Sequence, residues 1–345
     1  MKVLRLAAFL IGLGSAVTFG VQVGHAQDAA GVAAHLAAAK KAVGSDHAAL
    51  YRTVCARFEP PSAATAGGAR GGRGAGAAAD AAPPPAPVAN PVKVFDNLYW
   101  LGGVGAVAWA IDTPDGIIIT DPLYDYQVQP IVVGGLQKLG LDPKRIRYVV
   151  INHGHGDHYA GARFLQDTYG ARVMMPQVEW DYIERRAVTD EVARPRPRRD
   201  MVVTDGQKFT LGGTTITFYI TPGHTPGTTS PLITVTDRGR PHVAAMWGGT
   251  GWTEFEITDP DDKKRPVYQA YYDSAVRYRD LVTKAGADVI ISNHGQYDNA
   301  VAKNALLAKR GPNDPHPWVI GTQRTADYVT VAAECAATGL ASIRR

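Results

Sequence analysis

The chain has 345 residues, a formal net charge of +4 and two cysteines. Its apolar content of 45% excludes a wholly disordered chain, and its length suits one large domain with an appendage. The charge is too small to indicate a nucleic-acid partner, so we expect a small-molecule substrate.

The first residues have the pattern of an export signal. Lys2 and Arg5 precede an apolar stretch over residues 6–23, and small residues surround a cleavage site after Ala26. We therefore predict a signal peptide over residues 1–26 and a periplasmic or secreted mature protein with no stable membrane insertion. An uncleaved membrane anchor is the alternative. No later stretch of the sequence is apolar for long enough to cross a bilayer.

The composition then divides the chain into three further parts. Residues 27–60 show two helical patterns, separated at "GSD", where Ser45 or Asp46 can cap the second helix. Residues 61–91 contain "GGARGGRGAG" and "PPPAP" and are predicted to be a linker. We predict a catalytic domain over residues 92–345.

The two cysteines, Cys55 and Cys335, have no neighbouring Cys or His in a zinc-finger spacing. In an oxidising compartment they can pair, which would stabilise the fold by about 4 kcal/mol in the chain-entropy model. Two free buried thiols are the alternative.

Short strands and helices alternate after Val92. Strand patterns occur at residues 93–103, 104–111, 113–121, 148–151, 208–213, 214–223, 231–236, 241–247 and 288–295. Helical patterns occur at 129–139, at 160–169, from about Pro266 to Ala285, and twice more before the C-terminus. This part of the chain has two successive halves, each with both strands and helices. This order predicts an α+β sandwich of sheets covered by helices.

Five histidines follow the ends of apolar runs, where binding and catalytic residues are often found. They are His153, His155 and His158 in "INHGHGDHYAG", His224 after "TFYITPG", and His294 after "DVIISN". Together with Asp157 they provide the donors that zinc prefers. Because alternate residues of an extended turn face alike, His153 and His155 are expected to converge on one metal, while Asp157 and His158 turn toward a second. His224 and His294 would complete one set each.

These motifs resemble the metallo-β-lactamase fold superfamily, whose members are αββα four-layer sandwich hydrolases. The resemblance runs from about Val92 to the C-terminus and rests on HxHxDH, "TPGHTPGTT", the final histidine, and the Asp that ends "GIIITD". Within the superfamily, the sequence is most similar to the β-lactamase subclass that binds its second zinc through Asp, His and His, without a cysteine.

The resemblance implies two Zn²⁺ ions. The first would be held by His153, His155 and His224, and the second by Asp157, His158 and His294. Asp121 would steady the ligand loop by hydrogen bonds from behind, a role that such carboxylates often serve.

The loop "WGGTGW" departs from the superfamily pattern. Many thioesterase and nuclease members carry a metal-bridging Asp here, but no Asp stands between Met246 and Trp252. This absence favours a β-lactamase-like site. The serines with which that subclass holds a substrate carboxylate are absent too. Tyr159, Thr250 and Trp252 are the candidate substrate contacts; packing of Tyr159 at a helix start is the alternative.

The sequence thus predicts an exported zinc hydrolase that opens the cyclic amide of β-lactams and so contributes to antibiotic resistance. Zinc lowers the pKa of its bound water to about 7, so a hydroxide can attack the carbonyl carbon at neutral pH, and Asp157 can orient it. Two alternatives stay open: the same centre acting on lactones or other esters, and a metal-binding or redox module without hydrolysis. The oligomeric state is not indicated.

Overall fold

The computed structural model of the chain describes residues 28–60, 90–102, 105–185, 194–253 and 258–343. The predicted signal peptide and all but the last two residues of the predicted linker lie outside these ranges, so both stay predictions. Within the described ranges, no helix is both long and apolar enough to cross a membrane.

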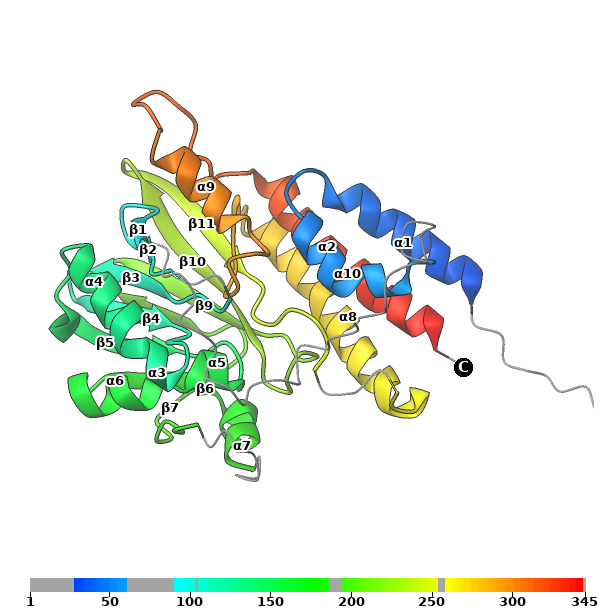
Figure 1. The fold of residues 1–345 in the computed structure, drawn as a ribbon, viewed down its shortest axis with the longest axis horizontal. Helices are drawn as coiled ribbons and strands as arrows, with labels where there is room; N and C mark the ends of the chain where they lie inside the picture. Colours follow the sequence, from blue (N-terminus) through cyan, green and yellow to red (C-terminus); the bar gives the residue numbers. More distant parts are fainter. Residues whose placement is uncertain (1–27, 61–89, 103–104, 186–193, 254–257, 344–345) are drawn as a thin grey trace, which may run out of the picture.

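Two sheets lie face to face between layers of helices (Figure 1). The first sheet has seven described strands in sequence order: β1 (Val92–Lys93), β2 (Leu98–Trp100), β3 (Trp109–Thr113), β4 (Gly116–Thr120), β5 (Ile146–Val150), β6 (Arg172–Pro176) and β7 (Met201–Val203). The strands from β1 to β4 pair antiparallel, and those from β4 to β7 pair parallel. The carboxyl ends of β4 and β5 therefore meet at one edge.

The second sheet has five described strands in the order β12-β11-β10-β9-β8. They are β8 (Lys208–Leu211), β9 (Thr214–Ile220), β10 (Thr229–Asp237), β11 (Arg240–Met246) and β12 (Val289–Ile291). All pairs are antiparallel except β11 with β12. The tight turn between β8 and β9 uses Gly212 and Gly213, both in the left-handed region with φ of 50° and 85°.

Because side chains alternate along the strands, the two faces of the first sheet contribute to two different apolar cores. In β4, Ile118 points into the core between the sheets, where it joins Trp109 and Phe218. Ile117 and Ile119 belong instead to the core between the first sheet and its helices. Because successive side chains of a strand point to opposite faces, a continuous apolar strand indicates a sheet that is covered on both sides.

The helices over the first sheet are α3 (Asp125–Gln127), a π-helical segment η2 (Val128–Val133), α4 (Gly134–Lys138), α5 (Gly156–Tyr159), α6 (Ala162–Tyr169) and α7 (Gln177–Arg185), with a 3₁₀ turn η3 (Pro143–Arg145) before β5. The sequence predicts one helix from Gln129 to Leu139, whereas the structure has a π-helical segment followed by a short α-helix. Pro130 lies within the π-helical segment, and a proline cannot donate the backbone hydrogen bond of a regular helix.

The helices over the second sheet are α8 (Asp261–Lys284) and α10 (Thr322–Ser342), while α9 (Ala300–Leu307) follows β12 (Figure 1). The predicted start of α8 at Pro266 is five residues too late. Asp261 and Asp262 form its first turn, where negative side chains interact favourably with the helix dipole.

The N-terminal segment (residues 28–60) packs on α10 as an additional layer (Figure 1). It contains α1 (Ala29–Val43), α2 (Ala48–Val54) and the 3₁₀ turn η1 (Ala56–Phe58). The predicted cap of the second helix is wrong: His47 occupies the N-cap position without a side-chain hydrogen bond, because Asp46 pairs with Arg324 at 3.0 Å instead. Cys55 and Cys335 form a disulfide, which decides between the two alternatives for the thiols. The predicted αββα sandwich is confirmed.

Candidate metal centre

The first cluster consists of His153, His155 and His224. The first two lie in the loop after β5, and His224 lies in the loop after β9. The structure brings one potential ligand atom of each within 4.8 Å of the others. His153 and His224 are 1% and 5% exposed, and their Nε2 atoms face each other at 3.2 Å.

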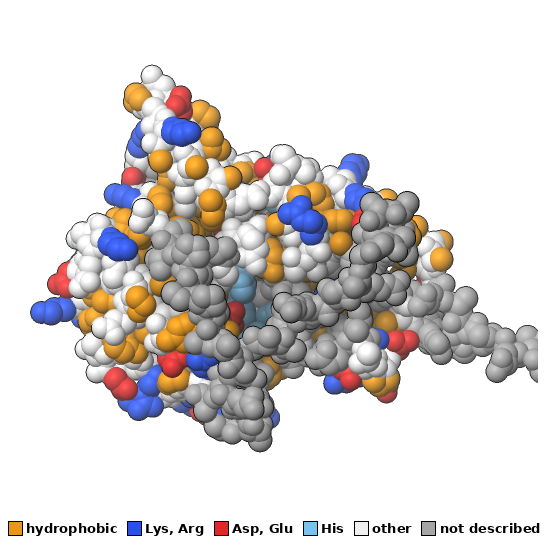
Figure 2. Space-filling view, in the orientation of Figure 1, with side chains coloured by type: hydrophobic (Ala, Val, Ile, Leu, Met, Phe, Trp, Pro, Cys, Tyr) orange, Lys and Arg blue, Asp and Glu red, His pale blue; other side chains and the backbone are white. Residues whose placement is uncertain are grey.

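The second cluster consists of Asp157, His158 and His294. Asp157 and His158 lie in α5, and His294 follows β12. Their potential ligand atoms also lie within 4.8 Å of one another, and the Nε2 atoms of the two histidines are 3.1 Å apart. The rings of His153 and His158 have centroids 4.0 Å apart, so the two clusters are adjacent. Histidine side chains reach the surface in the middle of the face shown in Figure 2.

The donor set of the first cluster fits a cation. His153 Nδ1 lies 2.7 Å from the carbonyl oxygen of Gly248, and His224 Nδ1 lies 2.9 Å from that of Gly251. A carbonyl oxygen only accepts, so both Nδ1 atoms carry the proton, and each neutral ring presents a lone pair at Nε2. Two lone pairs 3.2 Å apart cannot hydrogen-bond to each other. A metal ion between them would satisfy both, and the Nδ1 bonds would orient the rings toward it.

Asp121 is placed directly behind the second cluster. This residue follows β4, is fully buried, and has a left-handed backbone with φ of 47°. Its carboxylate accepts a hydrogen bond from His158 Nδ1 at 3.1 Å, and others from the backbone and side-chain N–H groups of Asn152 at 2.8 and 2.9 Å. A non-glycine residue in this conformation is uncommon and often marks a functional site. The predicted supporting role of Asp121 therefore has a geometry that suits it.

Two asparagines that the sequence analysis did not single out connect the clusters. Asn293 Nδ2 donates to Asp121 at 3.1 Å and to the carbonyl oxygen of Gly248 at 2.9 Å, the same oxygen that binds His153. Asn152 is the partner of Asp121 on the other side. The signal was present in the sequence, because each asparagine stands between an apolar run and a ligand histidine, in "VVINH" and "VIISNH".

Glu179 is a further residue that the sequence analysis missed. Its buried carboxylate accepts hydrogen bonds from the backbone N–H groups of Gly154 and Gly227, the second at 2.6 Å. These glycines lie in the loops that carry His153 and His224, so the carboxylate joins the two loops. The available signal was a carboxylate on the buried face of α7, where Ile183 lies one helical turn further on.

Comparisons with known proteins agree with this geometry. A sequence model of the metallo-β-lactamase superfamily matches residues 101–239. The solved FEZ-1 metallo-β-lactamase from Legionella gormanii is 24% identical, with a TM-score of 0.62 over 71% of this chain and 93% of that chain. BJP-1, a subclass B3 metallo-β-lactamase of Bradyrhizobium japonicum, is 22% identical, with a TM-score of 0.61 over 71% and 91%. Residues 101–239 thus match the metallo-β-lactamase superfamily, and the chain has the fold of its solved members.

Two curated relatives extend the comparison. A hydroxyacylglutathione hydrolase of Acidiphilium cryptum is 28% identical over 132 residues, which is 38% of this chain and 42% of that protein. A probable polyketide biosynthesis zinc-dependent hydrolase of Bacillus velezensis is 29% identical over 110 residues, or 32% and 42%. The matched region spans less than half of each relative. Both relatives are named as hydrolases, and the second as zinc-dependent.

The two clusters differ in charge. Burial, and then the charges of neighbouring histidines, hold the pKa of His153 well below its ordinary value, and burial lowers the pKa of His224 to about 4. In the second cluster, burial opposes ionisation of both Asp157 and His158, but their mutual attraction outweighs it. The pKa of Asp157 is lowered, and the pKa of His158 is raised to about 10 with the help of Asp121. His153 and His224 are therefore neutral, whereas the second cluster contains an ion pair.

The three candidate substrate contacts lie in different surroundings. Trp252 is 7% exposed and packs in the core over the second sheet. Thr250 is partly buried in the same loop, and Tyr159 is partly buried against the core of the first sheet. Their roles toward a substrate stay predictions.

Tyr124 and Arg194 lie beside the second cluster. The Arg194 guanidinium lies 4.7 Å from the centre of the Tyr124 ring and pairs with Asp125 at 3.1 Å. A side chain at Gly156 would contact both Arg194 and Tyr124, which places them against the residue before Asp157. Burial and the Asp157 charge raise the pKa of Tyr124 to about 12, so its hydroxyl stays protonated at neutral pH.

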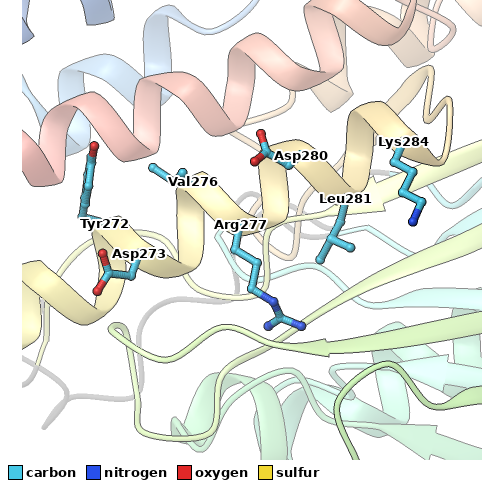
Figure 3. A pocket seen from close by; sticks show the side chains of 7 residues that line it. All are labelled: Tyr272, Asp273, Val276, Arg277, Asp280, Leu281 and Lys284. Carbon is cyan, nitrogen blue, oxygen red and sulfur yellow. The ribbon is translucent and has the colours of Figure 1, made fainter.

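A shallow groove elsewhere on the surface does not belong to the metal centre. Residues of α8 between Tyr272 and Lys284 line it, and no residue of either cluster does (Figure 3). The metal centre is therefore identified from its donor atoms, and the groove contributes no residue to it.

Proposed function

We propose that the protein is a hydrolase with two zinc ions, one at each cluster, and that it opens the cyclic amide of β-lactams. The observation that carries the proposal is the pairing of two adjacent three-donor clusters. Three protein ligands with an open position are characteristic of catalytic zinc, whereas structural zinc has four.

When bound, the zinc ions supply Lewis acidity and a water nucleophile at neutral pH. The chain supplies orientation. Asp157, whose lowered pKa keeps it ionised, has Oδ2 at 3.3 Å from His158 Nε2 and 3.8 Å from His294 Nε2. Its carboxylate can accept a hydrogen from a water at the centre and so direct the oxygen lone pair toward a carbonyl carbon. Asp121 and Asn293 hold the ligands from behind, so the site is organised before substrate arrives.

The loop over residues 247–253, the wall loop, supports the choice of a β-lactam as substrate. A bridging Asp in this loop would favour thioester or nuclease chemistry, and glycines stand there instead. A Cβ at Gly248 would lie 1.9 Å from the carbonyl oxygen of Thr229, and one at Gly249 would lie 2.5 Å from His224 Cβ. The wall loop thus leaves no room for side chains at these two positions. The structural neighbours titled β-lactamases point the same way.

Hydrolysis of esters, lactones or thioesters is the second candidate function. It is favoured by the curated relative named as a hydroxyacylglutathione hydrolase. For either substrate class, Arg194 and Tyr124 beside the second cluster supply a cation and a hydroxyl donor for an anionic group, in place of the absent serines. The predicted contacts Tyr159 and Thr250 would lie on the same substrate path.

We propose that the protein is exported to the periplasm or secreted. The signal-like residues 1–26 support this, and so does the Cys55–Cys335 disulfide, since disulfides persist in oxidising compartments.

The proposal is tested by assaying the purified mature protein, loaded with zinc, on a chromogenic cephalosporin, a lactone panel and an acylated glutathione thioester. Each assay is repeated after chelation and with the Asp157→Ala variant as control. We expect cephalosporin turnover that chelator and variant both remove. Turnover of the lactones or the thioester alone would move the assignment to the second candidate. Turnover that survives chelation would contradict the zinc mechanism.

A further inference from the structure

The N-terminal segment reaches the wall loop of the metal centre. Phe58, the last residue of η1, packs edge-on against Trp252 with ring centroids 6.0 Å apart. The guanidinium of Arg57 lies 5.2 Å from the centre of the Trp252 ring. Two successive residues that stand almost 200 positions earlier in the chain therefore cover one face of this tryptophan.

Helix α8 encloses Trp252 from other directions. The ring centroid of Tyr268 lies 5.0 Å from that of Trp252, and the centroid of Tyr271 lies 5.6 Å away. The Tyr271 hydroxyl also accepts a hydrogen bond from the backbone N–H of Gly251 at 3.3 Å. Since the indole is wedged between α8 and the N-terminal segment, its position depends on both.

The neighbours of Trp252 in the chain contact the first cluster. Before it, the Gly251 carbonyl oxygen accepts from His224 Nδ1 at 2.9 Å. After it, the Thr253 hydroxyl donates to the His224 carbonyl oxygen at 2.8 Å and lies 3.4 Å from His155 Nε2. With Gly248 bound to His153 at 2.7 Å, the wall loop contacts all three histidines. A shift of Trp252 would therefore move the partners of every ligand in the first cluster.

The disulfide fixes the segment close to this contact. Phe58 donates its backbone N–H to the carbonyl oxygen of Cys55 at 2.9 Å, and Cys55 is bonded to Cys335 in α10. Beyond Phe58, Glu59 accepts a hydrogen bond from Tyr51 and pairs with Lys40, each at 2.7 Å. Phe58 is thus held on both sides within the segment.

We infer that Phe58 is a positioning residue for the first zinc site and that it acts through Trp252. The inference rests on the zinc sites of the proposed function and is independent of the substrate. Burial of Trp252 between two elements restricts the motion of the wall loop. The carbonyl oxygens that accept from His153 Nδ1 and His224 Nδ1 therefore stay in positions that orient both rings toward a bound metal ion. The second cluster, held by Asp121, depends less on this contact.

The test measures zinc affinity by competition with a chromophoric chelator, with the full mature chain. An Asp157→Ala background removes one ligand of the second cluster, so that the first cluster dominates the titration. In this background we expect Phe58→Ala to weaken zinc binding about tenfold, the lower end of the effect of residues that orient ligands. Phe58→Tyr, which keeps the ring, is expected to restore affinity. Phe58→Leu, which keeps apolar volume without the ring, should give an intermediate loss.

Leu36→Ala is the matched control. Leu36 lies in α1 and is buried in the same core, so its truncation costs stability while the Phe58 ring against Trp252 is kept. Unchanged zinc affinity in a folded Phe58→Ala or Phe58→Leu protein would overturn the inference, and so would an equal loss of affinity in Leu36→Ala. Absence of zinc binding in the Asp157→Ala protein and in the wild type would instead overturn the zinc sites of the proposed function.

Discussion

The two clusters of the metal centre have the same number of donors but are held in different ways. The first contains three imidazoles, and the backbone carbonyls of Gly248 and Gly251 orient the neutral rings of His153 and His224. The second contains the charged pair of Asp157 and His158, and the buried carboxylate of Asp121 supports it. The first cluster therefore depends on the exact path of the wall loop, while the second depends on charge.

The largest effect is expected when a ligand is removed from either cluster. His155→Ala and Asp157→Ala should each abolish turnover, because a mechanism with two zinc ions needs both sets of donors. Steady-state kinetics measure the loss, and circular dichroism checks that each variant is folded. Full turnover in either variant would show that its cluster has no part in the reaction.

A change of charge at Asp121 should affect the zinc affinities of the two clusters to different extents. Asp121→Asn keeps the size of the side chain and tolerates the left-handed backbone; it removes the negative charge and replaces one of the two accepting oxygens with an N–H donor that faces the donors around it. We expect zinc affinity at the second cluster to fall 10- to 100-fold, as for other groups that support metal ligands, with a smaller loss at the first. Stepwise chelator competition measures both affinities. An equal loss at the two sites would contradict the division by charge.

A steric change in the wall loop should act in the opposite sense. In Gly249→Ala, the new methyl group would lie 2.5 Å from His224 Cβ, so the histidine or the loop must shift. We expect zinc affinity at the first cluster to fall about tenfold and that at the second to change less. Gly134→Ala is a suitable control, because its added Cβ would meet its nearest neighbour, the Gln129 carbonyl oxygen, at an ordinary 3.7 Å. A larger loss at the second cluster would refute this expectation.

The last prediction concerns the stability of the turn that carries His294, not the affinity for metal. Asp298 in this turn accepts backbone hydrogen bonds from Ser292 and Ala300 at 2.7 and 3.0 Å, and burial raises its pKa to about 7 although Lys303 opposes the shift. The folded state therefore holds a proton that the unfolded state releases near pH 4. The free energy of unfolding of the metal-free protein should fall as pH rises from about 4 to 7, by at most about 1.4 kcal/mol per pH unit.

Denaturant titrations across this pH range, compared with Asp298→Asn, isolate the contribution of the carboxyl group. We expect the variant to lose this component of the pH dependence. Identical profiles for the two proteins would rule the carboxyl group out as its source.

The sequence analysis identified the donors that the structure brings together, because strand ends and short-range spacing are local properties. His153, His155 and Asp157 follow one apolar run closely enough for their chemistry to be recognised together. The residues that hold the ligands depend on contacts between distant segments. Glu179 contacts Gly227 across 48 positions, and its spacing from Ile183, which indicates burial, does not show which loops it joins.

The same reasoning explains the errors in the fold. The apolar spacing predicts a helix through Pro130, but this spacing does not take into account that proline lacks the backbone N–H of a regular helix. The start of α8 was placed at Pro266 because a proline is common in the first turn of a helix, whereas the structure adds one more turn before it. The packing of the N-terminal segment on α10 was indicated only by the possible pairing of Cys55 with Cys335, since the two elements lie at opposite ends of the chain.

The disulfide also has a covalent consequence. It joins residues 280 positions apart, so the polypeptide between Cys55 and Cys335 is a closed ring. A single proteolytic cut within residues 61–89 would open the ring without releasing the N-terminal helices. The result would be a two-chain protein that runs as one species on a denaturing gel and separates only after reduction. Such a nicked molecule would retain Phe58, and with it the residue that covers Trp252.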